Sequence, residues 1–319
     1  MTQPLENVLD RLKAVAEESR LRVLAVCAEG ELSVTEIARI LGQSQPRVSR
    51  HLKVLLSAGL LLRFREGHSV LYRAVRRGEA GRIIDLALSM LPEDDGLLQR
   101  DRTRLAEVRA RRARSAADYL RFHAEDWHRL LDASFDSGEF NRAVLDTVNS
   151  ARGGDLGELL DIGTGTGRIL KLLGRYAETA VGIDLCPKML EVARAAMHES
   201  RLSSAMVRQA DMYNLPFASQ TFDTVTVDQI LFQAERPAEV IAEASRVLKA
   251  DGCLLIVDFA RAGDGTKELT ADSTGSLFGV RESDIEEWLR RAGLACRRTT
   301  RLTSASLTVV LTVAQRGRA

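Results

Sequence analysis

A glycine-rich turn and two flanking carboxylates in the C-terminal two-thirds of the chain have residue types and spacing suited to holding a nucleoside. Residues 158–162 read as a short strand that runs straight into the turn, whose glycines are Gly163, Gly165 and Gly167. Glycine lets the backbone approach a ligand closely, and the first N–H groups of a following helix are free to donate. Asp184 ends the next predicted strand, where a carboxylate suits a bidentate grip on ribose hydroxyls.

The spacing of the glycines separates the possible nucleotide ligands. A dinucleotide-binding turn reads G-x-G-x-x-G, whereas this turn reads G-x-G-x-G and is followed by Arg168. The Gly-Lys-Ser/Thr of a phosphate-binding P-loop is absent. Asp161, just before the turn, would repel a pyrophosphate but attract the amino group or sulfonium of S-adenosylmethionine. The motif therefore favours S-adenosylmethionine, or its product S-adenosylhomocysteine, over NAD.

Further strands and helices are expected around this turn. Residues 206–212 read as a third strand ending near Asp211, which can accept a hydrogen bond from an adenine amino group. Residues 221–228 and 253–259 read as a fourth and a fifth strand, and residues 285–293 as a helix. Residues 307–313 alternate between apolar and polar, as a half-exposed edge strand would.

The stretch from about residue 118 to 319 resembles class I S-adenosylmethionine-dependent methyltransferases, especially small-molecule enzymes such as those of quinone biosynthesis. The motifs that carry the resemblance are Asp161–Gly167, Gly182–Leu185 with Met189, Gln209–Asp211 and Arg246–Leu248. The resemblance implies that the glycine turn underlies the methionine part and that Asp184 holds the ribose. It also implies that Leu185 and Met189 line the cofactor site and that Asp211 and Met212 meet the adenine. Asp228 would lie near the methyl group, or would simply be a polar end of its strand.

No catalytic residue is assigned from the sequence. Methyl transfer from a sulfonium is an in-line displacement that depends mainly on positioning, and a base is needed only if the acceptor must lose a proton. His123, Trp127 and His128 lie on the helix before this domain, where packing and surface roles compete with catalysis. Many relatives carry histidines after the fourth strand, but residues 229–234 contain none. The methyl acceptor, if there is one, is expected to be a small molecule.

The N-terminal third has the pattern of a helix-turn-helix. Apolar residues between positions 5 and 16 form one helical stripe, and a second helix is expected over residues 21–28. Ser33 and Glu36 have the spacing of a capping box, and Gly42 can end that third helix in a left-handed conformation. A fourth helix starts at Ser44 with Pro46 in its first turn. Two β-prone runs, 60–65 and 69–74, flank a glycine turn and predict a hairpin wing.

The charge of this region predicts a nucleic-acid partner that the whole-chain total conceals. The 319 residues carry 45 basic and 44 acidic residues, a net charge of +1. Between residues 39 and 82, however, we count 10 basic and 2 acidic residues, a net of +8. The expected contacts to double-stranded DNA are Ser44, Gln45, Arg47, Ser49, Arg50, His51, Lys53, Arg65 and His68. The arginine-rich stretch of residues 97–131 is interpreted instead as a solvated helix face.

Residues 5–91 resemble the ArsR/SmtB family of bacterial repressors. The carriers are Arg47–Leu55 and the following Ala58-Gly59-Leu60. The resemblance implies a homodimer formed by the first and last helices, residues 5–16 and 83–91, with a recognition helix in the major groove. Ser33 and Thr35 stand where metal sensors of the family carry cysteines, and the last helix has no histidine. We therefore expect no metal site. Use of the helix-turn-helix for dimerisation alone is the alternative.

Together these patterns predict a mixed fold in three parts. An all-α winged helix-turn-helix domain is expected over residues 1–96, and a helical connector and lid over 97–150. An α/β Rossmann-like domain with a seven-stranded, mostly parallel sheet and an antiparallel edge strand is expected over 151–319. No apolar run is long enough to span a membrane, the N-terminus has no secretion signal, and the four cysteines form neither a disulfide framework nor a zinc motif. A cytoplasmic protein is expected.

Three functions are compatible with these observations. The first is a transcriptional regulator whose methyltransferase-like domain senses S-adenosylmethionine or S-adenosylhomocysteine, an arrangement that resembles repressors of methionine-cycle genes. The second is a working small-molecule methyltransferase that also binds DNA, for example to regulate its own gene. The third is an enzyme in which the winged helix only holds the dimer together. We favour regulation and leave open whether the cofactor domain turns over.

Overall fold

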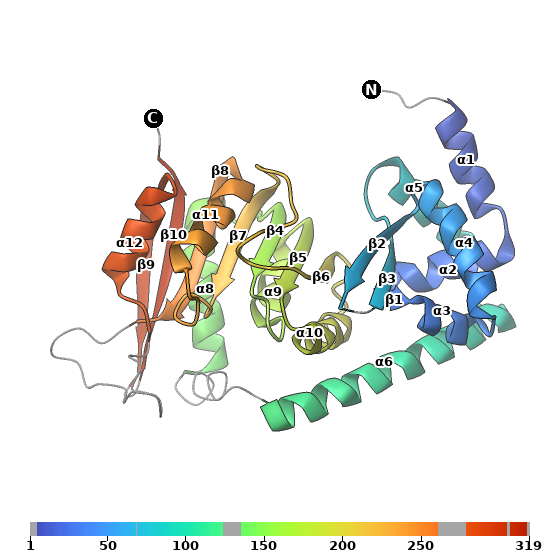
Figure 1. Ribbon diagram of the computed structural model, residues 1–319, viewed down its shortest axis with the longest axis horizontal. Coiled ribbons are helices and arrows are strands. Elements are labelled where there is room, and N and C mark those ends of the chain that lie inside the picture. The colour runs from blue at the N-terminus through green and yellow to red at the C-terminus, as the bar shows by residue number, and fades with distance from the viewer. Residues whose placement is uncertain (1–4, 68, 124–134, 261–278, 305–306, 318–319) are drawn as a thin grey trace. The chain divides into compact units, whose positions relative to one another are not determined.

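The computed structural model describes residues 5–67, 69–123, 135–260, 279–304 and 307–317 (Figure 1). The chain divides into two compact units, Met1–Ala116 and Ala117–Ala319, called here the N-terminal and C-terminal units. No helix in the described ranges is long and apolar enough to cross a membrane.

The N-terminal unit is a helix-turn-helix with a small β-sheet. Its elements are α1 (Leu5–Val15), α2 (Glu18–Ala28), β1 (Leu32–Ser33), α3 (Val34–Leu41), α4 (Gln45–Ser57), β2 (Leu61–Glu66), β3 (Ser69–Ala74), α5 (Gly78–Ser89) and the first part of α6 (Gly96–His123). The predicted hairpin is confirmed as β2 paired antiparallel with β3. The sequence missed β1, which pairs Leu32 with Tyr72 across the sheet, because two residues are too few to show an alternating pattern.

Local chemistry sets the bounds of α3 and α4 as the sequence predicted. The Ser33 side chain accepts from the Glu36 N–H, and the Glu36 side chain accepts from the Ser33 N–H, so the capping box is complete. Gly42 ends α3 with a φ of 65°, a left-handed conformation that costs glycine little. Two residues later Ser44 precedes α4, with Pro46 in its first turn. Buried side chains such as Ile37 and Leu52 join the two helices to one core.

Helix α6 packs into the core of the N-terminal unit along its first half. Asp95 begins it by accepting from the N–H groups of Leu97 and Leu98, at 2.9 Å each. Leu105 and Val108 are buried in the same core as the helix-turn-helix. The compact unit therefore extends to Ala116, past residue 96 where the sequence placed the end of the DNA-binding domain. The predicted helix is present to His123, and the rest of the 97–131 stretch lies outside the described residues.

The C-terminal unit contains a seven-stranded sheet in the order β6-β5-β4-β7-β8-β10-β9. The elements are α8 (Ser137–Arg152), β4 (Glu158–Ile162), α9 (Arg168–Leu173), η1 (Gly174–Tyr176), β5 (Thr179–Asp184), α10 (Pro187–Glu199), β6 (Ala205–Gln209), β7 (Phe222–Asp228), α11 (Pro237–Val247), β8 (Leu248–Phe259), α12 (Glu282–Arg291), β9 (Leu294–Thr303) and β10 (Thr308–Arg316). Strands β4 to β8 pair in parallel, and β10 runs antiparallel to both of its neighbours. The predicted mostly parallel sheet with antiparallel pairing at one edge is confirmed.

Apolar side chains cover both faces of this sheet. One core joins α8, α9 and α10 to the strands, with Val144, Ile169 and Leu190 among its buried residues. The other joins α11 and α12, through residues such as Ile241 and Ile285, to the opposite face. Alternation along the strands supplies both cores, as in three-layer α/β domains.

Two details of the sheet differ from the sequence prediction. The strand predicted over residues 307–313 exists as β10, but it is buried and lies one position inside the edge. The edge strand is β9, which the sequence missed because its run of exposed polar and arginine side chains does not look like a strand with a buried face. The third strand, β6, ends at Gln209, so Asp211 lies in a turn bridged to Asn214 rather than in the strand.

Candidate functional site

The glycine turn lies at the carboxyl end of β4, the edge at which open α/β sheets bind ligands. Gly163 adopts a φ of 69°, and a Cβ there would come within 2.6 Å of Ile230 Cγ2. The Thr164 N–H donates to the Ile183 carbonyl at 2.7 Å, which fixes the turn to the end of β5. Gly167, with a φ of 79°, precedes α9 directly. Both backbone shape and close packing therefore require glycine in this turn.

Asp184 joins the glycine turn to the end of β5. Its Oδ2 accepts from the Gly165 N–H at 3.0 Å, and its Oδ1 accepts from the Cys186 N–H at 2.8 Å. Burial raises the pKa of this carboxyl, against the opposing effect of those backbone hydrogen bonds. Each carboxylate oxygen can accept a second hydrogen bond, so the group can still bind two ribose hydroxyls.

Asp161 is 1% exposed, and its carboxylate makes hydrogen bonds inside the protein. Its two oxygens accept from the Thr164 and Thr226 hydroxyls, at 2.6 Å each. Burial raises the pKa of Asp161 to about 7, although both hydroxyls favour the ionised form. The sequence predicted a direct attraction between Asp161 and the cofactor. The structure shows a carboxyl that ties the glycine turn to β7.

Asp228, at the end of β7, forms an ion pair with Arg168, the first residue of α9. Arg168 Nη2 lies 3.0 Å from Asp228 Oδ2. The same guanidinium lies over the Phe140 ring, 4.1 Å from its centroid. Arg168 was absent from the predicted site, although its position directly after the last glycine of the turn was a usable signal. The pair places one fixed positive and one fixed negative charge beside the turn.

The other residues predicted to line the cofactor site follow the ends of β5 and β6 and the start of α10. Leu185 is 66% exposed, an unusual position for a large aliphatic side chain, and its carbonyl accepts from Gln209 Nε2 at 2.9 Å. Met189 is half-buried on α10, and Met212 packs against the second core. Asp211 is exposed, and its Oδ1 accepts from the Tyr213 N–H at 2.9 Å. An exposed aliphatic surface beside a carboxylate suits a purine ring that has an amino group.

Two further polar residues at this edge were missed by the sequence analysis. Asp258 is fully buried, accepts from the N–H groups of Leu231 and Phe259, and has its pKa raised to about 8 by burial. Gln229 is 6% exposed and adopts a φ of 54°, a conformation rare for a residue other than glycine. Neither atom of its side-chain amide has a hydrogen-bond partner among the described residues.

The buried carboxyls predict how the stability of the C-terminal unit depends on pH. Asp161 and Asp258 have raised pKa values in the folded protein, about 7 and about 8. Between about pH 4 and pH 8 the folded state therefore binds more protons than the unfolded chain, so stability falls as pH rises through this window. Thermal midpoints measured from pH 5 to pH 9 should decrease. Asp258→Asn should flatten that decrease, and an unchanged slope would contradict the assignment.

The outer face of α4 carries the residues predicted to contact DNA. Ser44, just before the helix, and Gln45, Arg47, Ser49, Arg50 and Lys53 within it are all exposed. Val48, Leu52 and Leu55 point into the core instead. Arg65 is exposed near the hairpin tip, where its Nε donates to the Gly67 carbonyl at 3.1 Å. His68 lies outside the described residues.

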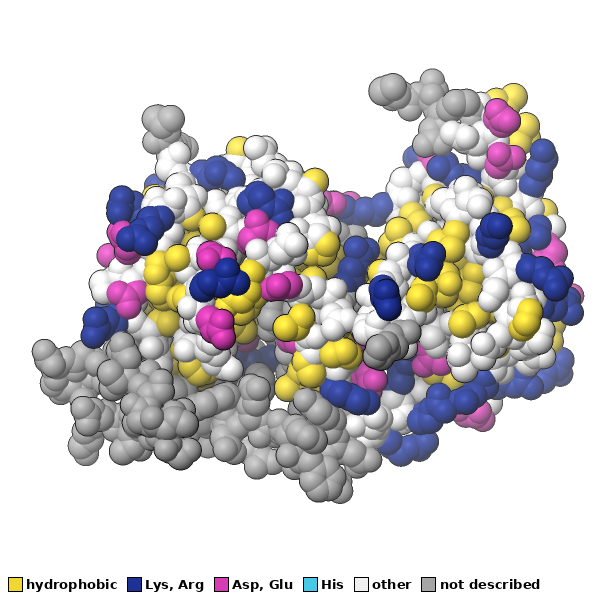
Figure 2. Space-filling model, in the orientation of Figure 1, with side chains coloured by type: hydrophobic (Ala, Val, Ile, Leu, Met, Phe, Trp, Pro, Cys, Tyr) yellow, Lys and Arg dark blue, Asp and Glu magenta, His cyan; other side chains and the backbone are white. Residues whose placement is uncertain are grey.

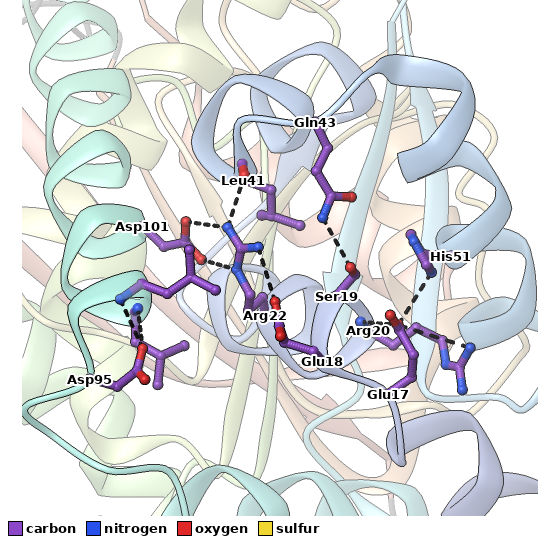
Figure 3. Close-up of polar contacts among 12 residues, drawn as sticks. Glu17, Glu18, Ser19, Arg20, Arg22, Leu41, Gln43, His51, Asp95 and Asp101 are labelled. Atoms are coloured by element: carbon purple, nitrogen blue, oxygen red, sulfur yellow. Dashed lines mark hydrogen bonds and ion pairs between the residues drawn. The ribbon is translucent and has the colours of Figure 1, made fainter.

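His51 does not share the outer face of α4. Its Nδ1 lies 3.4 Å from Glu17 Oε2, at the start of α2, and its Nε2 is buried without a described partner (Figure 3). Glu17 also accepts from the Arg20 N–H, which caps α2. His51 therefore links α4 to α2, which differs from the DNA-facing role predicted for it.

Part of the basic charge of the N-terminal unit is used inside the protein. Arg73 forms a buried ion pair with Glu31 at 2.5 Å, so it adds nothing to the DNA-facing charge. Figure 2 shows Lys and Arg side chains along α6. The interpretation of that run as a solvated face is wrong for Arg104, Arg109 and Arg112, which donate to residues of the β1–α3 region and of the segment before it.

Large apolar side chains remain uncovered on α1 and at the end of α5, the two helices predicted to form a dimer. Leu5, Leu9 and Leu12 of α1 are between 43% and 72% exposed. Leu86 and Met90, in and just after α5, are 63% and 70% exposed. The two helices pack against each other. No group of three potential metal ligands occurs among the described residues.

Comparison with known proteins finds a match to a different family model in each unit. The model described as "Bacterial regulatory protein, arsR family" matches residues 17–61. The model described as "Methyltransferase domain" matches residues 160–256. The first match covers α2 to the start of β2, and the second covers the glycine turn through the end of β7 and most of β8.

Individual relatives match between about a third and three-fifths of this chain. An uncharacterized methyltransferase YcgJ of Bacillus subtilis is 29% identical over 133 residues, 41% of this chain and 53% of that protein. A demethylmenaquinone methyltransferase of Thermotoga maritima is 37% identical over 103 residues, 32% of this chain and 43% of that protein. An uncharacterized 37.1 kDa protein in transposon TN4556 of Streptomyces fradiae is 28% identical over 205 residues, 60% of this chain and 56% of that protein. The chain thus spans about half the length of these relatives.

Solved structures give a similar picture at lower identity. The YcgJ protein of Bacillus subtilis has a TM-score of 0.48 and 18% identity, covering 56% of this chain and 99% of that one. An S-adenosylmethionine-dependent methyltransferase of Clostridium acetobutylicum has a TM-score of 0.49 and 16% identity, covering 63% of this chain and 99% of that one.

Proposed function

In a chain that carries an arsR-family helix-turn-helix region followed by a methyltransferase domain, we propose that the protein is a DNA-binding regulator whose second domain senses S-adenosylmethionine or S-adenosylhomocysteine. The observation that carries the proposal is the presence, in one chain, of an exposed basic face on α4 and a glycine turn with Asp184 beside it. An enzyme alone has no use for the first feature, and a DNA-binding module alone has none for the second.

The proposed DNA contacts are the exposed residues of the α4 face and the wing. They are Ser44, Gln45, Arg47, Ser49, Arg50, Lys53 and Arg65, with His68 retained from the sequence prediction. Two copies of α4 are needed to read two half-sites of an operator. The exposed leucines of α1 and the apolar residues at the end of α5 supply a surface on which a second copy would bury apolar area. We therefore propose a cytoplasmic homodimer that binds double-stranded DNA.

The cofactor contacts follow the edge of the sheet. The glycine turn would underlie the methionine part, Asp184 would bind the ribose, and Leu185 and Met189 would flank the adenine, with Asp211 and Met212 at its amino group. Asp161 would act indirectly, by holding the turn through Thr164. Asp228 and Arg168 would lie closest to the methionine end. The cofactor would supply an electrophilic methyl group when an acceptor is present.

Arg50→Ala provides the first test of the DNA-binding half. If Arg50 contacts a base edge, the variant should lose about 1–3 kcal/mol of binding free energy to the DNA upstream of its own gene. Calorimetry should show that its affinity for S-adenosylhomocysteine is unchanged. Arg82→Ala, an exposed arginine on α5, is the matched control and should bind DNA like the wild type. Equal losses in the two variants would contradict the assignment of α4 as the recognition helix.

The sensor half is tested by measuring DNA affinity with and without each ligand. A coupling in the range typical of allosteric proteins would change the affinity about 5- to 150-fold. Unchanged DNA affinity in the presence of saturating S-adenosylmethionine and S-adenosylhomocysteine would reject sensing.

The second candidate function is a small-molecule methyltransferase with the winged helix used for autoregulation or dimerisation. It is favoured by the methyltransferase model that matches residues 160–256, by relatives described as methyltransferases, and by the fixed charges of Arg168 and Asp228 beside the turn. Transfer of a labelled methyl group from S-adenosylmethionine to any small acceptor would establish it.

A further inference from the structure

Helix α3, the first helix of the helix-turn-helix, is held at its C-terminal end by two arginines from other helices. Arg104 of α6 donates from Nη1 to the Ile40 carbonyl at 3.1 Å. Arg22 of α2 donates from Nη2 to the Leu41 carbonyl at 2.9 Å. Carbonyls in the last turn of a helix lack intrahelical partners, and cations there also complement the helix dipole. These contacts fix the end of α3 just before the turn into α4.

The N-terminal end of α3 is held by α6 as well. Arg112 binds both oxygens of Glu36, with Nη2 to Oε2 at 2.6 Å and Nε to Oε1 at 2.9 Å. The same guanidinium donates from Nη1 to the Glu31 carbonyl at 2.9 Å. Burial alone would raise the pKa of Glu36, but Arg112 and Ser33 together lower it. The carboxylate that completes the capping box of α3 is therefore also bound by α6.

The order and spacing of these contacts indicate that α6 passes α3 in the opposite direction, with one arginine near each end of α3. Arg104 and Arg112 are eight residues apart, about 12 Å along a helix axis, and α3 itself has eight residues. The earlier residue of α6 binds the end of α3, and the later one binds its start. Leu105 and Val108, between the two arginines on α6, are buried in the same core as Ile37 and Ile40 of α3. Figure 1 shows the two helices side by side.

Arg104 also lies against the turn itself. A Cβ on Gly42 would come within 2.8 Å of Arg104 Nη1, so the guanidinium occupies the space beside the turn. Ser44, two residues further along, precedes α4. Movement of α6 along its axis would therefore displace the turn at Gly42, which connects α3 to the start of α4.

We propose that Arg104 and Arg112 are positioning residues for DNA binding, through which α6 controls the orientation of α4. The inference rests on the proposed DNA-binding function and names its regulatory input. Helix α6 continues from these contacts to His123, past the boundary at Ala116, so it belongs to both units. A change in either arginine contact would shift α3 and, through the turn, α4. DNA affinity would then change although the DNA face itself is unaltered.

The test compares affinity and its salt dependence for DNA upstream of the protein's own gene. Arg104→Met and Arg112→Met should each weaken binding about tenfold, a magnitude within the range of allosteric couplings. Because neither residue contacts a phosphate, the slope of log affinity against log salt should stay at the wild-type value. A phosphate-contacting residue would instead reduce the slope by about 1. Arg112→Lys should recover part of the loss, since it keeps the charge but not the bidentate geometry.

Arg102→Met is the matched control, because Arg102 is an exposed arginine of α6 whose guanidinium donates to the Glu93 carbonyl and not to α3. Variants that bind like this control, or that reduce the salt slope, would overturn the inference. Amide exchange in the full-length variants should show faster exchange at the end of α3 with the rest of the core protected. A wild-type protein that binds no DNA would instead overturn the proposed function, and this inference with it.

Discussion

Replacing Asp101 with alanine is expected to destabilise the N-terminal unit by about 3–5 kcal/mol, the cost of breaking one partner of a buried ion pair. Asp101 of α6 and Arg22 of α2 are 3% and 4% exposed. Arg22 Nε and Nη2 donate to the two carboxylate oxygens at 2.6 and 2.8 Å (Figure 3). Without Asp101 the guanidinium would keep its charge in an apolar core, where the Leu41 carbonyl and the exposed Glu18 are weaker partners than the lost carboxylate.

Urea unfolding followed by circular dichroism measures this change, with amide exchange in α2 to assign it to the N-terminal unit. Asp94→Ala, at an exposed carboxylate of the loop before α6, should leave the transition where it is. Arg22→Met combined with Asp101→Leu should regain most of the lost stability, because well-packed apolar residues can replace a buried pair. If Asp101→Ala lowers the free energy of unfolding by less than about 1 kcal/mol, the prediction is wrong, because an effect that small is typical of exposed ion pairs.

Asp184→Ala is expected to lower the affinity for S-adenosylhomocysteine about 100-fold, or close to 3 kcal/mol. Two hydrogen bonds from ribose hydroxyls to a carboxylate would be lost, and bonds to charged groups contribute roughly 1.5–3 kcal/mol each. The variant would also release the Gly165 and Cys186 N–H groups that the carboxylate now accepts from. The glycine turn would then keep its Thr164–Ile183 hydrogen bond to β5 but lose the one through Asp184, so the remaining binding surface would be less well ordered.

Calorimetric titration of S-adenosylhomocysteine into the full-length variants measures the effect. Asp184→Asn, which keeps one acceptor oxygen, should lie between alanine and the wild type. Glu199→Ala, at an exposed carboxylate near the end of α10, should bind like the wild type. If Asp184→Ala binds S-adenosylhomocysteine within threefold of the wild type, Asp184 does not bind the ribose.

Features whose physical cause lies within a few neighbouring residues could be predicted from the sequence. The capping box of Ser33 and Glu36, the left-handed Gly42 and the glycine turn after β4 each depend on local backbone geometry, which the residue types dictate. The alternation and spacing of strands likewise predicted the sheet, because parallel strands and crossover helices leave a repeating pattern. The candidate site could be predicted from the same pattern, because parallel strands bring their carboxyl ends to one edge of the sheet.

Features that depend on partners far apart in the chain were missed. Arg168 pairs with Asp228, 60 residues away, and Arg22 pairs with Asp101, 79 residues away. Nothing in the neighbourhood of a charged residue says whether it meets water, DNA or a buried carboxylate. His51 was misplaced for the same reason, since it lies in sequence among the residues predicted to contact DNA but is turned toward Glu17. Strand β9 was missed because pairing with β10, rather than its own composition, makes it a strand.

The packing of α6 also limits where the gene for this protein can be truncated or recombined without disrupting the N-terminal unit. A reading frame stopped at Gly96 would encode every element of the winged helix yet omit the carboxylate that neutralises Arg22 and both arginines that bind α3. Its product would contain the helix-turn-helix but lack the contacts that stabilise it, so it would be a poor minimal fragment for testing DNA binding. Recombination that exchanges the C-terminal unit for another domain would have to preserve the codons up to about Ala116, where the first compact unit ends. The junction of this fusion therefore lies inside a helix, where a replacement domain must continue the helix in phase.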